Sequence, residues 1–145
     1  MKSLNLFLNI IAPIVIGGFI YLTFRTEDLL MFKWFYFLGL EDSIQYFRQN
    51  FNHLEPVIPD WFIYSLPTCL WVYSLTNCMI FIWKGKLTLI SMLWVTSGVI
   101  LAITGEVSQI IDLIPGTFDL IDLISIIITS GFILLNIRRV ELYAK

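Results

Sequence analysis

The chain has 145 residues, of which 58% are hydrophobic and 14% are charged, and its net charge is −2. Soluble domains average about 45–50% apolar and about 25% charged residues, so this composition excludes an ordinary water-soluble domain. It indicates a single integral membrane domain covering 1–145. The sequence holds no cluster of basic and aromatic residues, so we expect no nucleic-acid partner.

Four long apolar runs follow one another along the chain. The second is uncharged and bracketed by Trp61 and Trp83, the aromatic pattern typical of the two membrane interfaces. The third ends against Glu106, and the fourth is interrupted only by Asp122. About 20 apolar residues cross the hydrocarbon core as a helix. The sequence therefore predicts an all-α polytopic membrane protein with four transmembrane helices, at about 6–24, 61–83, 87–109 and 118–137.

The long connection 25–60 between the first two spans is predicted to form an outer-face helical lid. Leu29 to Leu40 is apolar except for Lys33 and too short to span, so we expect it in the outer interface. A polar helix starts at Glu41-Asp42-Ser43 and carries Ile44, Phe47 and Phe51 on one face. Prolines 56 and 59 end it. A spacer lying on the membrane is the alternative to a lid.

The basic residues predict the orientation. With the N-terminus in the cytoplasm, six basic residues lie inside and three outside, so the positive-inside rule places both termini in the cytoplasm. Ten of the eleven acidic residues then fall on the outer side. A cleaved signal peptide is the alternative for the first run, but no small-x-small cleavage site follows it, which favours an uncleaved anchor.

Three carboxylates and a glutamine converge where the last two spans meet. Glu106 and Gln109 are three residues apart on one helix, and Asp119 and Asp122 share a face of the next. The turn 110–117, with its Pro-Gly pair, makes the two helices antiparallel neighbours. Carboxylates at the edge of hydrocarbon are costly, so we expect these groups to face one another at the outer end of the bundle.

Three interpretations of this acidic site are open. The acids bind or activate a lipid head group or a glycan carrier, or they hold a divalent cation through oxygen ligands. Alternatively they form a structural lock, in which Asp119 caps the fourth helix and Glu106 or Asp122 pairs with Arg25 or Arg48. The substrate or head-group site is therefore predicted at Glu106, Gln109, Asp119, Asp122, Arg25 and Arg48.

Other chemistry has little support in the sequence. The second span carries small and polar groups at helical spacing, typical of helix packing in membranes, and Pro67 is expected to kink that helix. Cys69 and Cys78 point to opposite sides and are predicted to be packing residues. The lone His53 is predicted to be solvated. No catalytic residue is assigned, and we expect no cofactor and no resident metal.

The stretch from Glu106 resembles the VanZ-like membrane proteins. The pattern consists of Glu106-x-x-Gln109, then Pro115-Gly116, then Asp119-x-x-Asp122. Two positions depart from the family: Thr117 replaces its turn arginine, and its asparagine after the last Asp falls near Ser125 or Ile126 here. The resemblance implies a location in the bacterial cell envelope and a relation to glycopeptide resistance, without an agreed biochemical activity.

We therefore expect a multi-pass protein of the bacterial cytoplasmic membrane with both termini in the cytoplasm. The favoured function is recognition or modification of an envelope lipid or glycan intermediate at the acidic site. A non-enzymatic membrane subunit or assembly factor is the alternative, and a small cation channel or transporter is the third. Expected partners are membrane lipids, a lipid-linked envelope intermediate, and a membrane protein or a second copy of this chain.

Overall fold

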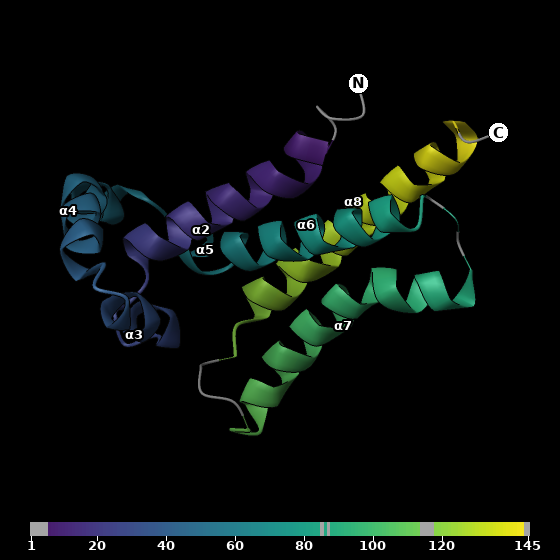
Figure 1. The fold of residues 1–145 in the computed structure, drawn as a ribbon. Coiled ribbons are helices and arrows are strands. Elements are labelled where there is room, and N and C mark those ends of the chain that lie inside the picture. The colour runs from purple at the N-terminus through teal and green to yellow at the C-terminus, as the bar shows by residue number, and fades with distance from the viewer. Residues whose placement is uncertain (1–5, 85, 87, 114–117, 144–145) are drawn as a thin grey trace.

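The chain is all-helical over the residues that the computed structural model describes, 6–84, 86, 88–113 and 118–143, with Asn52 and 134–143 described by backbone alone. All described secondary-structure elements are helices (Figure 1). In chain order they are η1 (a π-helix, Phe7–Ile11), α2 (Ala12–Phe24), α3 (Leu30–Phe37), α4 (Glu41–Phe51), η2 (a 3-10 helix, Asn52–Val57), α5 (Asp60–Tyr64), α6 (Leu66–Ile82), α7 (Leu89–Ile110) and α8 (Leu120–Tyr143).

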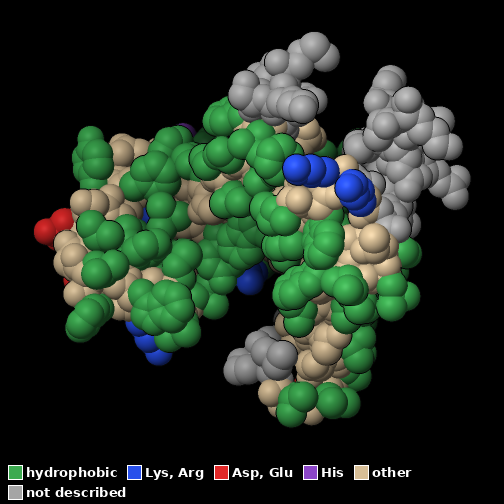
Figure 2. All heavy atoms as spheres, turned by 45° about the vertical axis from the view of Figure 1, so that its right-hand side comes forward, with side chains coloured by type: hydrophobic (Ala, Val, Ile, Leu, Met, Phe, Trp, Pro, Cys, Tyr) green, Lys and Arg blue, Asp and Glu red, His purple; other side chains and the backbone are tan. Residues whose placement is uncertain are grey.

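Three of these helical segments are long and apolar enough to cross a membrane. They are Phe7–Phe24, Asp60–Ile82 and Leu89–Ile110, which match the first three predicted spans to within about two residues. Hydrophobic side chains cover most of the face drawn in Figure 2, as expected for a surface that meets lipid. The chain is therefore a membrane protein with three candidate membrane-spanning helices.

The fourth predicted span, 118–137, remains a prediction. Helix α8 runs for 24 residues, about 36 Å, but its described apolar part is the shorter stretch Leu120–Ile133. Figure 1 places the start of the first helix, the end of α6 and the end of α8 at one end of the bundle, and α3, α4 and the end of α7 at the other. This arrangement agrees with the predicted topology, although which end faces the cytoplasm also remains a prediction.

Helix α6 is the centre of the bundle and packs against α2, α7 and α8. The predicted face of small and polar groups forms these contacts, with Ser65, Cys69 and Thr76 all buried. Both cysteines are free, and Cys78 is half-buried. The predicted kink takes the form of a break at Ser65, where α5 ends and Pro67 lies in the first turn of α6.

The interface between the first helix and α6 uses two hydrogen bonds and one glycine. Ser74 donates its hydroxyl hydrogen to the carbonyl oxygen of Ile10 over 2.6 Å, and the Tyr73 hydroxyl donates to the side chain of Asn9 over 2.6 Å. Ser74 is fully buried, so its hydroxyl needs a partner within the protein, and the carbonyl oxygen of Ile10 supplies it. Beyond this contact, Trp71 packs directly on Gly17.

The segment 25–60 packs against the side of α2. Helix α4 begins at Glu41 as predicted, and the rings of Phe47 and Phe51 lie edge-on to Phe19, with centroids 5.3 and 5.2 Å away. Helix α3 exposes Trp34 and Phe37, as expected for a helix in the outer interface. Helix α5, which begins at Asp60 where this segment ends, contacts α8. A lid closed over the acids therefore remains a prediction.

The close approach of α2 and α6 predicts different effects for two neighbouring glycines. A Cβ atom at Gly17 would lie 2.8 Å from Nε1 of Trp71, whereas one at Gly18 has no such neighbour within 4 Å. Gly17→Ala should therefore lower the free energy of unfolding by about 1–3 kcal/mol, because the indole ring must shift. Gly18→Ala should leave stability unchanged or raise it by up to about 1 kcal/mol, because alanine favours helix.

Thermal unfolding of both variants in the same detergent, followed by circular dichroism, measures this difference. Equal melting temperatures for Gly17→Ala and Gly18→Ala would contradict the packing described here.

Candidate functional site

Glu106 is the most buried of the predicted site residues. It lies in the last two turns of α7, is 9% exposed, and its Oε2 atom has no hydrogen-bond partner among the described residues. A buried carboxylate oxygen without a partner is unusual, because leaving such a group unsatisfied costs about 1–3 kcal/mol. Glu106 therefore presents an acceptor that the described part of the chain does not use.

Asp122 is held by α6. The hydroxyl of Ser65, which is 2% exposed, donates a hydrogen bond to Oδ1 of Asp122. This contact turns the acidic face of α8 towards the α5–α6 break. The prediction that the acids of the fourth helix face the bundle interior is thus confirmed for Asp122, with a partner on α6 rather than on α7.

Asp119 caps α8. Its Oδ1 accepts a hydrogen bond from the main-chain N–H of Ile121 over 2.8 Å, and its side chain is exposed. Since an N-cap side chain satisfies a main-chain donor that the helix leaves free, this part of the predicted structural lock is confirmed.

The cap predicts how two substitutions at Asp119 differ. Asp119→Ala should lower the free energy of unfolding by about 1 kcal/mol, because the N–H of Ile121 loses its acceptor. Asp119→Asn keeps an acceptor oxygen and should retain most of that stability. Denaturant unfolding in detergent micelles measures both, and equal losses in the two variants would contradict the capping role.

The three carboxylates share one electrostatic environment. Glu106 interacts electrostatically with Asp122, Asp119 and Arg25, and with the main-chain donor of Asp119. We refer to Glu106, Asp119 and Asp122 as the acid cluster. Gln109 is half-buried one turn after Glu106, and its side chain has no hydrogen bond to a described residue. Both aspartates thus lie within electrostatic range of Glu106, at the end of the bundle where α7 ends and α8 begins.

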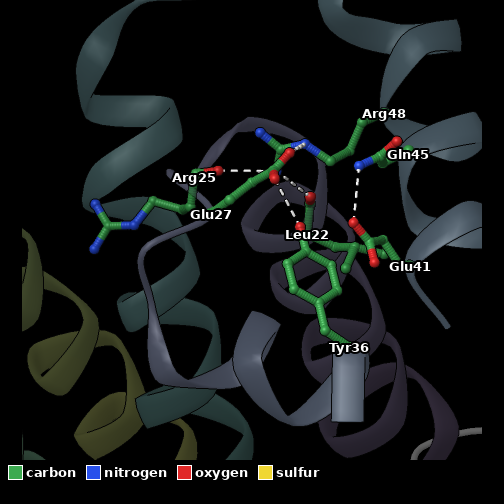
Figure 3. Close-up of polar contacts among 7 residues, drawn as sticks. All are labelled: Leu22, Arg25, Glu27, Tyr36, Glu41, Gln45 and Arg48. Atoms are coloured by element: carbon green, nitrogen blue, oxygen red, sulfur yellow. Dashed lines mark hydrogen bonds and ion pairs between the residues drawn. The ribbon is translucent and has the colours of Figure 1, made fainter. Parts of the chain in front are cut away.

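Arg25 is the basic residue near this cluster. Its guanidinium lies 5.3 Å from the centre of the Tyr21 ring and 5.0 Å from that of Tyr64, both cation–π distances. In Figure 3 its side chain points away from Glu27 and Arg48. Within the described part of the chain, it makes no hydrogen bond or ion pair. Arg25 therefore has unused donors beside the acid cluster.

Arg48, the other predicted basic residue, contacts the end of α2 and Glu27 (Figure 3). Its Nη1 donates to the carbonyl oxygens of Leu22 and Arg25 over 2.8 and 2.9 Å. Its Nε lies 3.4 Å from Oε1 of Glu27, and its guanidinium lies over the ring of Phe32. The last carbonyls of a helix lack partners within the helix. Arg48 therefore ties α4 to the end of α2 and does not pair with Glu106 or Asp122.

Two further members of this connection, Glu27 and Tyr36, were not predicted from the sequence. The Tyr36 hydroxyl donates to Oε2 of Glu27 over 2.7 Å. Because ionisation of Tyr36 would lose this hydrogen bond to a carboxylate, the contact raises the pKa of Tyr36 to about 12. The sequence signal for this connection is weak: Glu27 lies close to the end of the first span. Its partners Tyr36 and Arg48 come from two later helices, α3 and α4, so their pairing with Glu27 has no local pattern.

Removal of Arg48 should destabilise the segment 25–60. Arg48→Ala should lower the free energy of unfolding by about 2 kcal/mol, because two carbonyl oxygens and a carboxylate lose a charged donor in a partly buried place. Lys33→Ala removes an exposed cation from α3 and is the matched control. Thermal unfolding in detergent measures both, and an Arg48→Ala variant as stable as Lys33→Ala would rule out the connection.

The described residues contain no group of three or more His, Cys, Asp or Glu side chains placed to hold a metal ion. No protein-family model matches the chain, and comparisons with curated proteins and with solved structures also give no match. The resemblance to VanZ-like proteins therefore remains a hypothesis that rests on the residue pattern from Glu106 to Asp122, in which 114–117 lie outside the described residues.

Proposed function

We propose that this protein binds the polar head group of a membrane lipid, or of a lipid-linked envelope intermediate, at the acid cluster. One observation carries the proposal: Oε2 of Glu106 is buried without a partner among the described residues, at the end of a bundle whose spans are apolar enough to lie in lipid. A ligand that donates a hydrogen bond there recovers the cost of burying that acceptor.

The neighbours of Glu106 narrow the chemistry of this ligand. The acid cluster offers acceptors, so it favours hydroxyl or amine donors. Arg25 offers donors without a described acceptor, and guanidinium groups bind phosphate well. A head group that combines a phosphate with hydroxyl or amine groups satisfies both sides, and lipid and lipid-linked sugar head groups have this composition.

Location supports the same function. The excess of basic residues at the termini and in the α6–α7 turn favours a cytoplasmic position for that end. The acid cluster then lies at the outer boundary of a bacterial cytoplasmic membrane, the location that the VanZ-like resemblance also implies. Recognition is the simplest activity for such a site. Modification of the bound intermediate would require Glu106 or Asp122 to move a proton as well.

Glu106→Gln tests the proposal, because it keeps the size of the side chain and removes its charge. We expect this variant to bind the head group about tenfold more weakly, since a charge-assisted hydrogen bond is lost. Native mass spectrometry of the full chain, extracted from vesicles of phosphatidylethanolamine and phosphatidylglycerol, measures the lipid-bound fraction. Glu55→Gln, at an exposed carboxylate on η2, is the matched control. Equal lipid retention in wild type and both variants would refute head-group binding at Glu106.

A non-enzymatic membrane subunit is the second candidate. In the span Leu89–Ile110, 17% of the most apolar stretch is buried within the protein. The corresponding share in Asp60–Ile82 is 39%. Helix α7 therefore offers a broad apolar face to lipid, to a partner or to a second copy. The same mass spectra distinguish these cases, because bound protein adds far more mass than bound lipid.

A further inference from the structure

We propose that the lipid whose head group binds near Arg25 places one hydrocarbon chain in an apolar groove between the first helix and α6. This inference rests on the proposed function and adds to it the length and place of the lipid chain. It rests on a separate observation, the groove itself. The groove begins near Ile14, towards the N-terminal end of α2, whereas Arg25 lies at the C-terminal end of that helix.

The groove has a volume of about 380 Å³ and is lined by Ile10, Ile14, Trp71, Ser74, Leu75 and Cys78. Its one hydroxyl, that of Ser74, already donates to the carbonyl oxygen of Ile10. The wall is otherwise aliphatic, aromatic or thiol, so a polar occupant would lose its own hydrogen bonds. Since the lining residues belong to two membrane-spanning segments, hydrocarbon is the occupant that fits this chemistry.

A line of aromatic side chains connects the groove to Arg25. Gly17 and Tyr21 follow Ile14 on the same face of α2, at helical spacing. The Trp71 ring packs on Gly17 and lies 5.2 Å from the ring of Tyr21, over which Arg25 is placed. The surface therefore continues from the apolar groove, over Trp71 and Tyr21, to a guanidinium with free donors.

The distance from Arg25 to the near edge of the groove matches one leaflet. Ile14, the lining residue of the first helix that is nearest Arg25 in the chain, is about three helical turns from it, or roughly 16 Å along the axis. One leaflet is half of a hydrocarbon core about 30 Å thick. A lipid with its phosphate at Arg25 thus extends a chain of ordinary length to Ile14, where the chain end enters the groove. A partner helix fits less well, because close helix contacts in membranes use small residues and these walls are mostly bulky.

Photo-crosslinking in vesicles tests the inference. The full chain is placed in phosphatidylethanolamine vesicles with a trace of hexadecyl phosphate that carries a diazirine at the chain end. Mass spectrometry then maps the crosslinks. We expect several-fold more labelling of Trp71–Cys78 than of Ile100 and Leu101, two exposed residues at the middle of α7. Arg25→Gln should lower groove labelling about tenfold, because the phosphate loses its charged donors, and Lys33→Gln should not.

A second pair of variants tests the groove. Ile14→Trp fills it and should abolish the excess labelling, whereas Val15→Trp, at the neighbouring exposed position, should not. Equal labelling of the groove and of Ile100 and Leu101 would overturn the inference, as would groove labelling that Arg25→Gln or Ile14→Trp leaves unchanged. If lipid retention nevertheless depends on Glu106, the proposed head-group site stands and only the chain placement fails. If it does not, both fail.

Discussion

Hydrogen bonds from the start and the middle of α6 attach the first helix and α8 to this central helix. Lipid is as apolar as the helices, so packing and polar contacts, rather than the hydrophobic effect, drive association within a membrane. Ser65 donates to Asp122 on α8, and Ser74 donates to the carbonyl oxygen of Ile10 on η1. The first contact lies at the N-terminal end of α6 and the second at its middle, and together they attach α8 and the first helix to it. The position of the acid cluster depends on the first of them.

The two arginines of the outer segment have separate tasks. Arg48 donates to main-chain carbonyl oxygens at the end of α2 and pairs with Glu27, and so holds α4 against the first helix. This contact also orders the chain around Arg25, because the carbonyl oxygen of Arg25 is one of the two that Arg48 binds. The guanidinium of Arg25 lies over the rings of Tyr21 and Tyr64. A structural cation thus positions a second cation whose donors are available to a ligand.

Local sequence patterns predicted much of the fold. Contacts between residues far apart in the chain could not be predicted in this way. The lengths of the apolar runs predicted four spans, of which three are candidate membrane-spanning helices in the structure. The acids at Glu41 and Asp42 predicted the start of α4, and the position of Asp119 predicted a cap. The partner of Asp122 was not predictable, because Ser65 is 57 residues away and looked like a packing residue. The role of Arg48 was missed for the same reason: its acceptors are main-chain carbonyls, which carry no sequence signal. The fourth span and the lid remain predictions.

The central claim is that Glu106 is buried at the end of the bundle to receive a donor from a lipid head group. An experimental structure of the full chain in a lipid nanodisc tests it most directly. The account predicts non-protein density within about 3 Å of Oε2 of Glu106, continuing past Arg25 towards the groove at Ile14. A Glu106 side chain that points into bulk water or acyl chains, with no such density, would contradict it.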